Sequence, residues 1–333
     1  MREVARLAEV SIKTVSRVIN GETTVDPELA ERVRRAARIL DYRPNLTARN
    51  LRSSDGRTRT IGVLLENVAN PFSAAIHRAI EDTAGARGFA VLAGSLDEDP
   101  VRERTLALAL ISRQVDAMIV MPSGEDQSYL ASEQQAGLKL VFVDRSPRGL
   151  VADTVVSDNV AGAMQGVRHL IAHGHRRIAF LGDRRTIQTA TQRHEGYVAA
   201  LREAGLPVEE SLVRWDLHDE QSARQAVEEL ITDARPSALF ASQNLVTAGS
   251  IRALRALGRQ HEIALVGLDD FMLADMLEPA ITVVSQDPRT IGLLACELVF
   301  RRLDGDGCPA LTERVGMSLI VRGSGEIRPA AEG

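Results

Sequence analysis

The sequence predicts a small all-α head followed by an α/β domain of two lobes, each a parallel sheet with helices on both faces. Three observations lead to this fold class. Only helical patterns precede residue 60, and from there short apolar runs alternate with amphipathic helices. The alternation restarts after Ser157. At 333 residues the chain is also too long for a single domain of this kind.

The head is expected to contain three short helices, at residues 2–8, 11–20 and 27–40. Ser11 can cap the second helix by accepting a hydrogen bond from its first turn. Asp26 and Pro27 start the third helix, because aspartate caps helices and proline tolerates the first helical position. A further short helix is expected at 45–51, and the polar stretch 53–60 is expected to be a linker.

The remaining chain alternates strands and helices, as parallel βαβ units do. Strands are expected at residues 61–65, 90–93, 117–121, 138–143, 178–181, 238–241 and 264–267. Helices are expected at residues 72–87, 101–113, 160–172, 194–204, 222–232 and 246–257. A ligand of such a domain belongs at the carboxyl ends of the strands, in the crevice between the lobes.

Charge is distributed unevenly, although the total is only -5. Residues 1–57 contain 11 Arg, one Lys and 8 Asp/Glu, which is +4 and leaves -5 - 4 = -9 for the rest. A basic head on an acidic body is typical of a DNA-binding domain joined to a soluble partner domain. Lysine occurs only at Lys13 and Lys139, so arginine is the default cation and its local abundance decides little.

Several functional classes are disfavoured by what the sequence lacks. No apolar run is long enough to span a membrane and the N-terminus has no signal-peptide core, so a cytoplasmic location without membrane contact is expected. Cys296 and Cys308 offer neither a disulfide framework nor a zinc site. No phosphate loop, dinucleotide fingerprint or nucleophile motif occurs, so we expect no enzyme, no catalytic residue and no cofactor.

The spacing of residues 5–20 is typical of a helix-turn-helix motif. Ala5 is small where two helices cross, and Val10 and Val15 are expected to face the core. The outer side of the second helix can then enter the major groove of DNA and carries Ile12, Lys13, Thr14, Ser16 and Arg17. Lysine and arginine suit guanine edges, while short hydroxyl side chains reach phosphates. The helical pattern alone also fits an ordinary bundle with a charged face.

One succession of segments covers almost the whole chain. The head contains VARLAEVSIKTVSRVING, VDPELAERVRRAARILDYRPN and ARNL, and the rest contains TIGVLLENVANPF, VFVDRSP, VVSDNVAGAMQGVRHLIAHGHRRIAFLGD, VGLDDF and VRGS. This succession resembles the lac repressor (LacI/GalR) family of transcriptional regulators. Two departures stand out. Met1 falls within the first turn of the first helix, so a start upstream is an open alternative. Glu9 stands where the family commonly has glycine, at a cost on the order of 1 kcal/mol if the backbone there is left-handed.

The resemblance implies three parts: a helix-turn-helix head at 1–44, a hinge helix and linker at 45–59, and an effector-binding and dimerisation domain at 60–328. That domain would have a periplasmic-binding-protein-like fold. Its first lobe would comprise about 60–157 and 286–316, and its second lobe about 158–285 and 317–328. The family forms homodimers on pseudo-palindromic double-stranded operator DNA, so a repressor relieved by an inducer is expected here, ahead of co-repression. No heptad tail follows Arg322, so a tetramerisation helix is not evident.

The resemblance also assigns the DNA contacts. Base contacts fall to Ile12, Lys13 and Arg17, and phosphate contacts to Ser11, Thr14, Ser16 and Asn20. The hinge helix would contact DNA through Asn45, Ala48 and Leu51, with Leu51 wedged into the minor groove at the operator centre. A helix this short is marginal alone, so it would form only with DNA and the partner hinge present.

A small polar effector is implied between the lobes. The residues expected to contact it are Asn70, Phe72, Asp144, Arg145, Thr189, Arg193, His218, Gln243, Asp269 and Gln286. Carboxylate, amide and guanidinium groups suit vicinal hydroxyls, so a sugar or polyol is expected. A nucleoside or purine is the alternative, with Phe72 available for stacking. His218 stands where many relatives carry an aromatic residue, with Trp215 three residues earlier.

Two rival functions fit less well. A solute-binding protein would share the two lobes but would need a secretion signal and no DNA-binding head. An enzyme on this fold would need one of the motifs that are missing. The stretch His173-Gly174-His175 is expected, from the resemblance, to end a helix before a strand, so no metal site is predicted.

Overall fold

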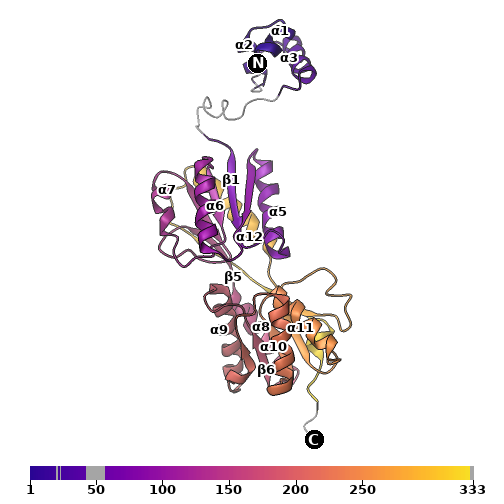
Figure 1. The fold of residues 1–333 in the computed structure, drawn as a ribbon. Coiled ribbons are helices and arrows are strands. Elements are labelled where there is room, and N and C mark those ends of the chain that lie inside the picture. Colours follow the sequence, from indigo (N-terminus) through magenta and orange to yellow (C-terminus); the bar gives the residue numbers. More distant parts are fainter. Residues whose placement is uncertain (20–21, 23, 43–56, 331–333) are drawn as a thin grey trace. The chain divides into compact units, whose positions relative to one another are not determined.

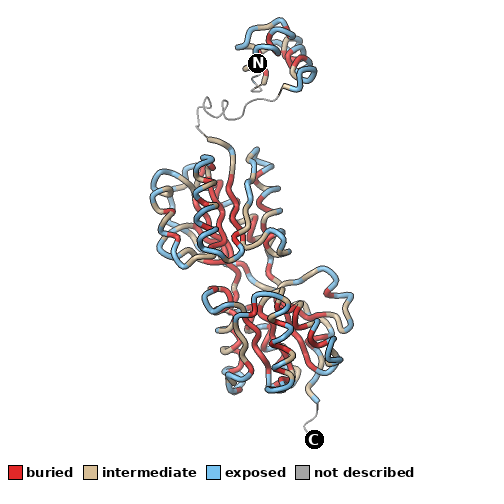
Figure 2. The backbone as a smooth tube through the Cα atoms, in the orientation of Figure 1, coloured by how far each residue is buried: buried red, intermediate tan, exposed pale blue. Residues whose placement is uncertain are grey.

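The computed structural model describes residues 1–19, 22, 24–42 and 57–330, and these fall into two compact units, Met1–Thr58 and Arg59–Gly333 (Figure 1). The first unit is the head and the second is the α/β unit. Buried residues follow the strands and the inner helix faces of the α/β unit, and exposed residues cover the outside (Figure 2).

Three helices form the described part of the head, as predicted: α1 (Arg2–Leu7), α2 (Ile12–Ile19) and α3 (Pro27–Ile39). Val4, Val15 and Val33 are completely buried where these helices meet. Asp26 caps α3, its carboxylate accepting hydrogen bonds from two backbone N–H groups of the first turn at 3.0 and 3.2 Å. The sequence signals for the third helix therefore act as expected.

The turn between α1 and α2 is left-handed at Glu9, where φ is 52°. A glycine adopts this conformation without strain, so the glutamate costs on the order of 1 kcal/mol. Arg32 of α3 braces the turn by donating to the Ala8 carbonyl at 2.6 Å and lying 3.3 Å from the Glu9 carboxylate. The exposed ion pair offsets only a small part of that cost.

The first lobe of the α/β unit has a six-stranded parallel sheet in the order β11-β5-β4-β3-β1-β2. Its strands are β1 (Thr60–Leu65), β2 (Ala90–Ser95), β3 (Ala117–Val120), β4 (Lys139–Val143), β5 (Asp153–Ser157) and β11 (Thr312–Val315). Its helices are α5 (Pro71–Ala86), α6 (Pro100–Ser112), the 3-10 turn η1 (Ser128–Leu130), α7 (Ala131–Gln135) and α12 (Pro288–Leu303). Ile61 and Val63 pack into one core with α5 and α12, while Leu64 packs into the core on the opposite face.

The second lobe repeats this plan, with the strand order β12-β10-β9-β8-β6-β7 and only β12 antiparallel to its neighbour. Its strands are β6 (Ile178–Leu181), β7 (Val213–Arg214), β8 (Ala238–Ala241), β9 (Ala264–Leu268), β10 (Thr282–Ser285) and β12 (Ser318–Ile320). Its helices are α8 (Asn159–Ala172), α9 (Gln188–Glu203), the 3-10 turn η2 (Glu210–Leu212), α10 (Glu220–Asp233), α11 (Asn244–Ala256) and α13 (Gly323–Glu326). Leu239 and Phe240 of β8 face opposite cores, so this sheet is also covered on both faces.

The chain passes between the lobes three times, after β5, after β10 and after β11. This brings α12 back to the first lobe, where it packs against α5 and beneath β4. The two-lobed fold class predicted from the sequence is therefore confirmed.

Several elements differ from the expected list. Helix α9 begins at Gln188, ahead of the expected start at residue 194, because its first turn is polar and gives no apolar period. The sequence analysis gave no residue range for six elements of the α/β unit, namely β5, β7, β10, β11, β12 and α12. The outer strands β7, β11 and β12 are short and half exposed, and therefore have no continuous apolar run.

Candidate functional site

The outer face of α2 is the candidate DNA-reading surface of the head. Ile12, Lys13 and Arg17 are exposed on it, and Thr14 and Ser16 are partly exposed. Ile12 has 48% of its surface exposed, so an apolar side chain is available at the start of α2. The positions fit a helix that enters a major groove with its N-terminal residues leading.

Ser11 has a structural role at this surface as well. Its hydroxyl accepts a hydrogen bond from the backbone N–H of Thr14 at 3.1 Å and lies 2.9 Å from the Thr14 hydroxyl. It therefore caps α2, as the sequence predicts. Four further predicted DNA contacts, Asn20, Asn45, Ala48 and Leu51, lie outside the described residues.

A cavity of about 260 Å³ lies between the lobes of the α/β unit. This is close to the lower end of the roughly 300–1,000 Å³ range of small-molecule pockets. The structure brings all ten predicted effector contacts to its lining, namely Asn70, Phe72, Asp144, Arg145, Thr189, Arg193, His218, Gln243, Asp269 and Gln286. Their role in binding stays a prediction, while their convergence is a property of the fold.

Strand ends explain this convergence. Asp144 follows β4 and Asp269 follows β9, both with left-handed backbones at φ 66° and 62° that turn the carboxylates into the cavity. Asn70 caps α5 after β1, accepting from the Phe72 N–H at 3.1 Å. Gln243 caps α11 after β8, its Oε1 accepting from two backbone N–H groups at 2.7 and 3.1 Å. Parallel strands thus deliver polar groups to one edge of each sheet.

Arg193 is held rigidly at the second lobe's side of the cavity. Its Nε donates to Asn159 Oδ1 at 2.7 Å, and its Nη1 donates to the Ser242 carbonyl at 2.9 Å. Gly196, one turn later, lies so close to α8 that a Cβ there would meet the Val160 carbonyl. This close contact between α8 and α9 holds the guanidinium against Asn159. Arg193 is therefore preorganised.

Asp269 forms the other fixed acceptor of the second lobe. Gln286, at a lobe crossover, donates to its Oδ1 at 2.8 Å. Burial raises the pKa of the Asp269 carboxyl, and the Arg193 guanidinium opposes that rise. The Gln286 Oε1 atom is buried without a partner among the described residues. The pair thus presents both an acceptor and a carboxylate to a ligand.

Arg145 is bound within the protein itself. It donates to both carboxylate oxygens of Glu98 at 2.8 and 2.6 Å and to the Pro122 carbonyl at 3.2 Å. Its Nε lies 3.4 Å from Asp144 Oδ2. The bidentate contact with Glu98 fixes the Arg145 side chain, so its main role is to orient Asp144 and not to contact a ligand directly.

Four carboxylates of the lining, Glu66, Asp97, Glu98 and Asp183, were missed by the sequence reasoning. Glu66 directly follows β1 and Asp183 lies two residues after β6, so the strand-end rule that selected Asp144 also applies to them. Burial and the neighbouring Glu98 raise the pKa of Glu66 to about 7. Burial likewise raises the pKa of Asp183.

Two hydrogen bonds join the lobes across the cavity. The Asn244 side chain donates to Asn70 Oδ1 at 2.8 Å. The Gln188 Oε1 atom accepts from the Ser146 backbone N–H at 2.8 Å. Asn70 and Asn244 line the cavity, and Ser146 and Gln188 are next to lining residues in the chain. A ligand that favours lobe closure would therefore affect these two hydrogen bonds.

Aromatic side chains contribute little to the cavity. Among the lining residues that the structure describes, Phe72 alone is a phenylalanine, tyrosine or tryptophan. Trp215 instead packs against Phe180, with ring centroids 5.3 Å apart, in the core of the second lobe. His218 is half exposed, and its Nδ1 donates to the Asp216 carbonyl at 3.1 Å. A second ring, Phe271, lines an adjoining cavity of about 320 Å³ that shares Phe72, Asp269 and Gln286 with this one.

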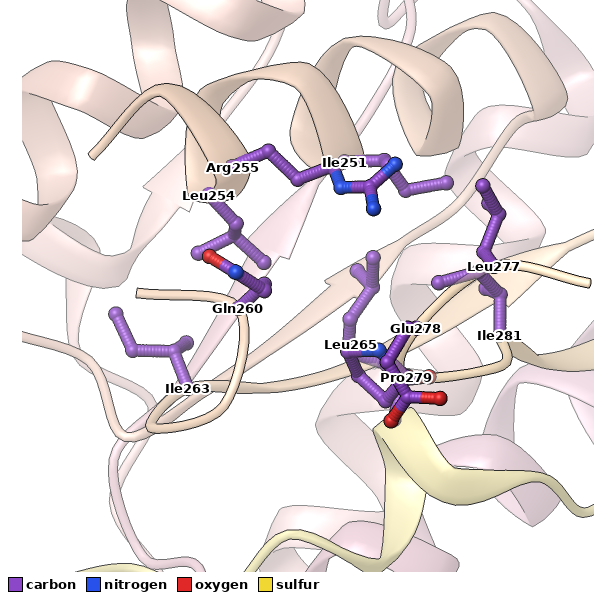
Figure 3. Close-up of a pocket in the computed structure, with 11 residues that line it drawn as sticks. Ile251, Leu254, Arg255, Gln260, Ile263, Leu265, Leu277, Glu278, Pro279 and Ile281 are labelled. Atoms are coloured by element: carbon purple, nitrogen blue, oxygen red, sulfur yellow. The ribbon is translucent and has the colours of Figure 1, made fainter. Parts of the chain in front are cut away.

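Apart from these two adjoining cavities, the other candidate features do not form a comparable site. A hollow beside α11 is lined mainly by Ile251, Leu254 and other aliphatic groups and has a volume of only about 20 Å³, enough for one water molecule (Figure 3). His173 ends α8, and His175 bonds Ser237 and the Ile327 carbonyl. Within the described residues there is no cluster of three or more potential metal ligands, and no helix is long and apolar enough to cross a membrane.

Comparison with known proteins gives matches in both units of the chain. A family model described as bacterial regulatory proteins, lacI family, matches residues 1–45, and one described as periplasmic binding protein-like domain matches residues 167–325. The HTH-type transcriptional regulator GalR of Escherichia coli (strain K12) is 32% identical over 327 residues, which cover 97% of this chain and 95% of that protein.

Solved structures give the same result. A complex of the transcriptional regulator CelR with cellobiose is 30% identical, with a TM-score of 0.72, and covers 97% of this chain and 98% of that one. The lac repressor dimer bound to operator and the anti-inducer ONPF has a TM-score of 0.85 and covers 98% of each chain. Its identity is 24%, so this likeness concerns the fold.

Proposed function

This chain belongs to the lacI family of bacterial regulatory proteins, and we propose that it is a repressor released from its operator by a sugar or polyol bound between its lobes. It is a DNA-binding transcriptional regulator with an effector-binding domain, and the family is not enzymatic. The identity of the effector, the direction of the response and the dimer belong to the proposal.

The observation that carries the effector class is the set of polar groups around the cavity. Arg193 and Asp269 are fixed on one lobe and Asp144 on the other, each by a hydrogen bond or ion pair to the protein. Carboxylates accept from hydroxyl groups and a guanidinium donates to them, so vicinal hydroxyls match this arrangement. The cellobiose complex of CelR shows a sugar bound by a relative of this fold. Phe72 lines this cavity and Phe271 lines the adjoining one, so the polar groups, and not a lack of rings, favour a sugar over a nucleobase.

Exposed apolar side chains support a homodimer. Met272, Leu273 and Met276 follow β9 and have 88%, 55% and 75% of their surfaces exposed. Three large apolar residues within five positions make a patch that a monomer would leave in water. A second copy of the chain is the natural partner, because two heads on a two-fold axis match a pseudo-palindromic operator.

The proposed mechanism links the cavity to DNA. A ligand bridging Asp144 on the first lobe and Arg193 on the second favours the closed arrangement of the lobes. Closure in a dimer changes the spacing of the two hinge segments, which lie outside the described residues. Operator and effector must then alter each other's affinity by the same factor.

A thermal-shift screen of the full chain tests the effector class. The panel contains sugars, polyols, sugar acids and nucleosides. A ligand at 100 times its dissociation constant stabilises the native state by about 2.7 kcal/mol and raises the melting temperature. Hits restricted to sugars or polyols support the proposal, whereas hits restricted to nucleosides overturn the effector class. The hits are then added to operator complexes, and tighter binding in place of release would show co-repression.

A further inference from the structure

The cavity between the lobes contains more negative charge than its own cations balance. Arg145 is the guanidinium at its centre, and Glu98 binds it through both oxygens while Asp144 lies 3.4 Å away. Glu66 and Asp183 also interact electrostatically with Arg145. Six carboxylates and three guanidinium groups line the cavity, so negative charge is in excess. Glu66 comes from the first lobe and Asp183 from the second.

The other lining arginines do not remove this excess. Arg193 is held by Asn159 and Ser242 and interacts electrostatically with Asp144, Asp269 and Asp183. Arg184, next to Asp183, is exposed, so its charge is screened by water. Asp97, the remaining lining carboxylate, already has its own partner, Arg102, at 2.8 Å. Glu66 accepts from the Asn70 amide at 3.3 Å and forms no ion pair with an arginine among the described residues.

Burial makes this excess unfavourable. The pKa of Glu66 is raised to about 7 by burial and by Glu98, and the pKa of Asp183 is raised by burial. Closing the lobes removes more water from these groups and brings like charges into a lower dielectric. A ligand that favours closure must therefore supply positive charge, or leave the carboxylates to take up protons.

A second observation points to a ligand at the same place. Asp144 is only 5% exposed, and its Oδ1 atom has no hydrogen-bond partner among the described residues. It lines the cavity next to Arg145. A buried carboxylate oxygen normally accepts a hydrogen bond, so the missing donor belongs to the ligand.

We propose that the effector is a polyhydroxylated amine, in its simplest form an amino sugar, whose ammonium group pairs with Glu66 while a hydroxyl donates to Asp144. This rests on the proposed function, since it refines the effector of the same cavity. An ammonium group has one positive charge, three donors and no acceptor, which suits a surface of carboxylates. A neutral sugar supplies the donors without the charge. A metal ion is disfavoured because the described residues contain no group of three or more metal ligands.

Isothermal titration of the full chain with matched sugars tests the proposal. D-glucosamine, D-galactosamine and D-mannosamine are each compared with the parent sugar and with the N-acetyl derivative, which keeps the skeleton but removes the charge. We expect at least one amino sugar to bind about tenfold or more tightly than both of its neutral counterparts, which is about 1.4 kcal/mol.

Two variants locate the effect. Glu66→Gln removes one negative charge with little change in shape and should reduce the ratio of amine to parent-sugar affinity to near unity. Asp97→Asn removes a charge from the same cavity at a carboxylate already paired with Arg102, and should keep the preference. An equal loss of preference in both variants would show a general charge effect and contradict the assignment to Glu66.

The outcomes separate this inference from the proposed function. Neutral sugars that bind as well as or better than the amines overturn the ammonium assignment and leave the sugar sensor standing. Binding of calcium chloride alone, lost in Glu66→Gln, also overturns it in favour of a metal. Failure of every sugar in the panel to bind contradicts both proposals.

Discussion

Replacing Glu66 by glutamine should change how the stability of the α/β unit depends on pH. The pKa of the Glu66 carboxyl is raised from 4.5 to about 7 by burial and by Glu98, with Arg145 and Asn70 opposing the rise and Asp144 adding to it. The folded state thus binds a proton that the unfolded state releases. Stability from this proton is fully present below about pH 4.5 and is lost as the pH rises through about 7.

The size of the effect follows from that difference. Each pH unit between the two pKa values corresponds to 1.36 kcal/mol, so the whole interval corresponds to about 3 kcal/mol. Glu66 is only partly buried, and solvent screening reduces the expected effect to about 1–2 kcal/mol. Glutamine keeps the shape and has no proton to lose. Glu66→Gln should therefore be more stable than the wild type above about pH 7, and similar to it near pH 5.

Urea unfolding followed by circular dichroism, from about pH 5 to about pH 8, measures this difference. Three histidines also titrate, because burial lowers their pKa values and their protonation destabilises the fold as the pH falls: His175, which is buried, and His169 and His194, which are partly buried. They act equally in both proteins, so the free energy of unfolding is compared between wild type and variant at each pH. A constant difference across the range would refute the electrostatic reasoning.

Four further predictions concern binding, stability and assembly. Arg193→Gln should abolish the response of operator binding to the effector by removing the guanidinium from the cavity, while Arg168→Gln on the exposed side of α8 should keep that response. Fluorescence anisotropy measures the response, and a normal response in the Arg193 variant would exclude Arg193 from the site. Leu51→Ala should weaken operator binding at least about tenfold and leave effector affinity in the free protein unchanged, so equal operator affinity would reject the hinge wedge. Glu9→Gly should stabilise the head by about 1 kcal/mol, because φ there is 52°, and an unchanged or lower melting temperature of the head would speak against strain. Met272→Glu should shift the chain from dimer to monomer in light scattering, and an intact dimer would place the interface elsewhere.

Much of the architecture was predictable because its signals are local. Buried strands such as β1 and β8 are continuous apolar runs, and Asp26 and Ser11 cap the helices that follow them by contacts within three residues. The strand-end rule located Asp144 and Asp269 for the same reason, since each follows a buried strand directly. The outer strands β7 and β11 lack such a signal because one side of each has no neighbouring strand.

The sequence by itself determined that this chain has a helix-turn-helix head and a two-lobed α/β body, and which residues follow its strands. It also identified the family, since motif order is a property of the chain alone. Only the tertiary structure showed that Glu66, Glu98 and Asp183 gather around Arg145 and share its charge. Charge balance depends on distances between residues far apart in the chain, and the pairing Glu98–Arg145 spans 47 positions. The Glu98–Arg145 distance is set by packing within the first lobe, and Asp183 joins the group from the second lobe, so no local pattern encodes this arrangement.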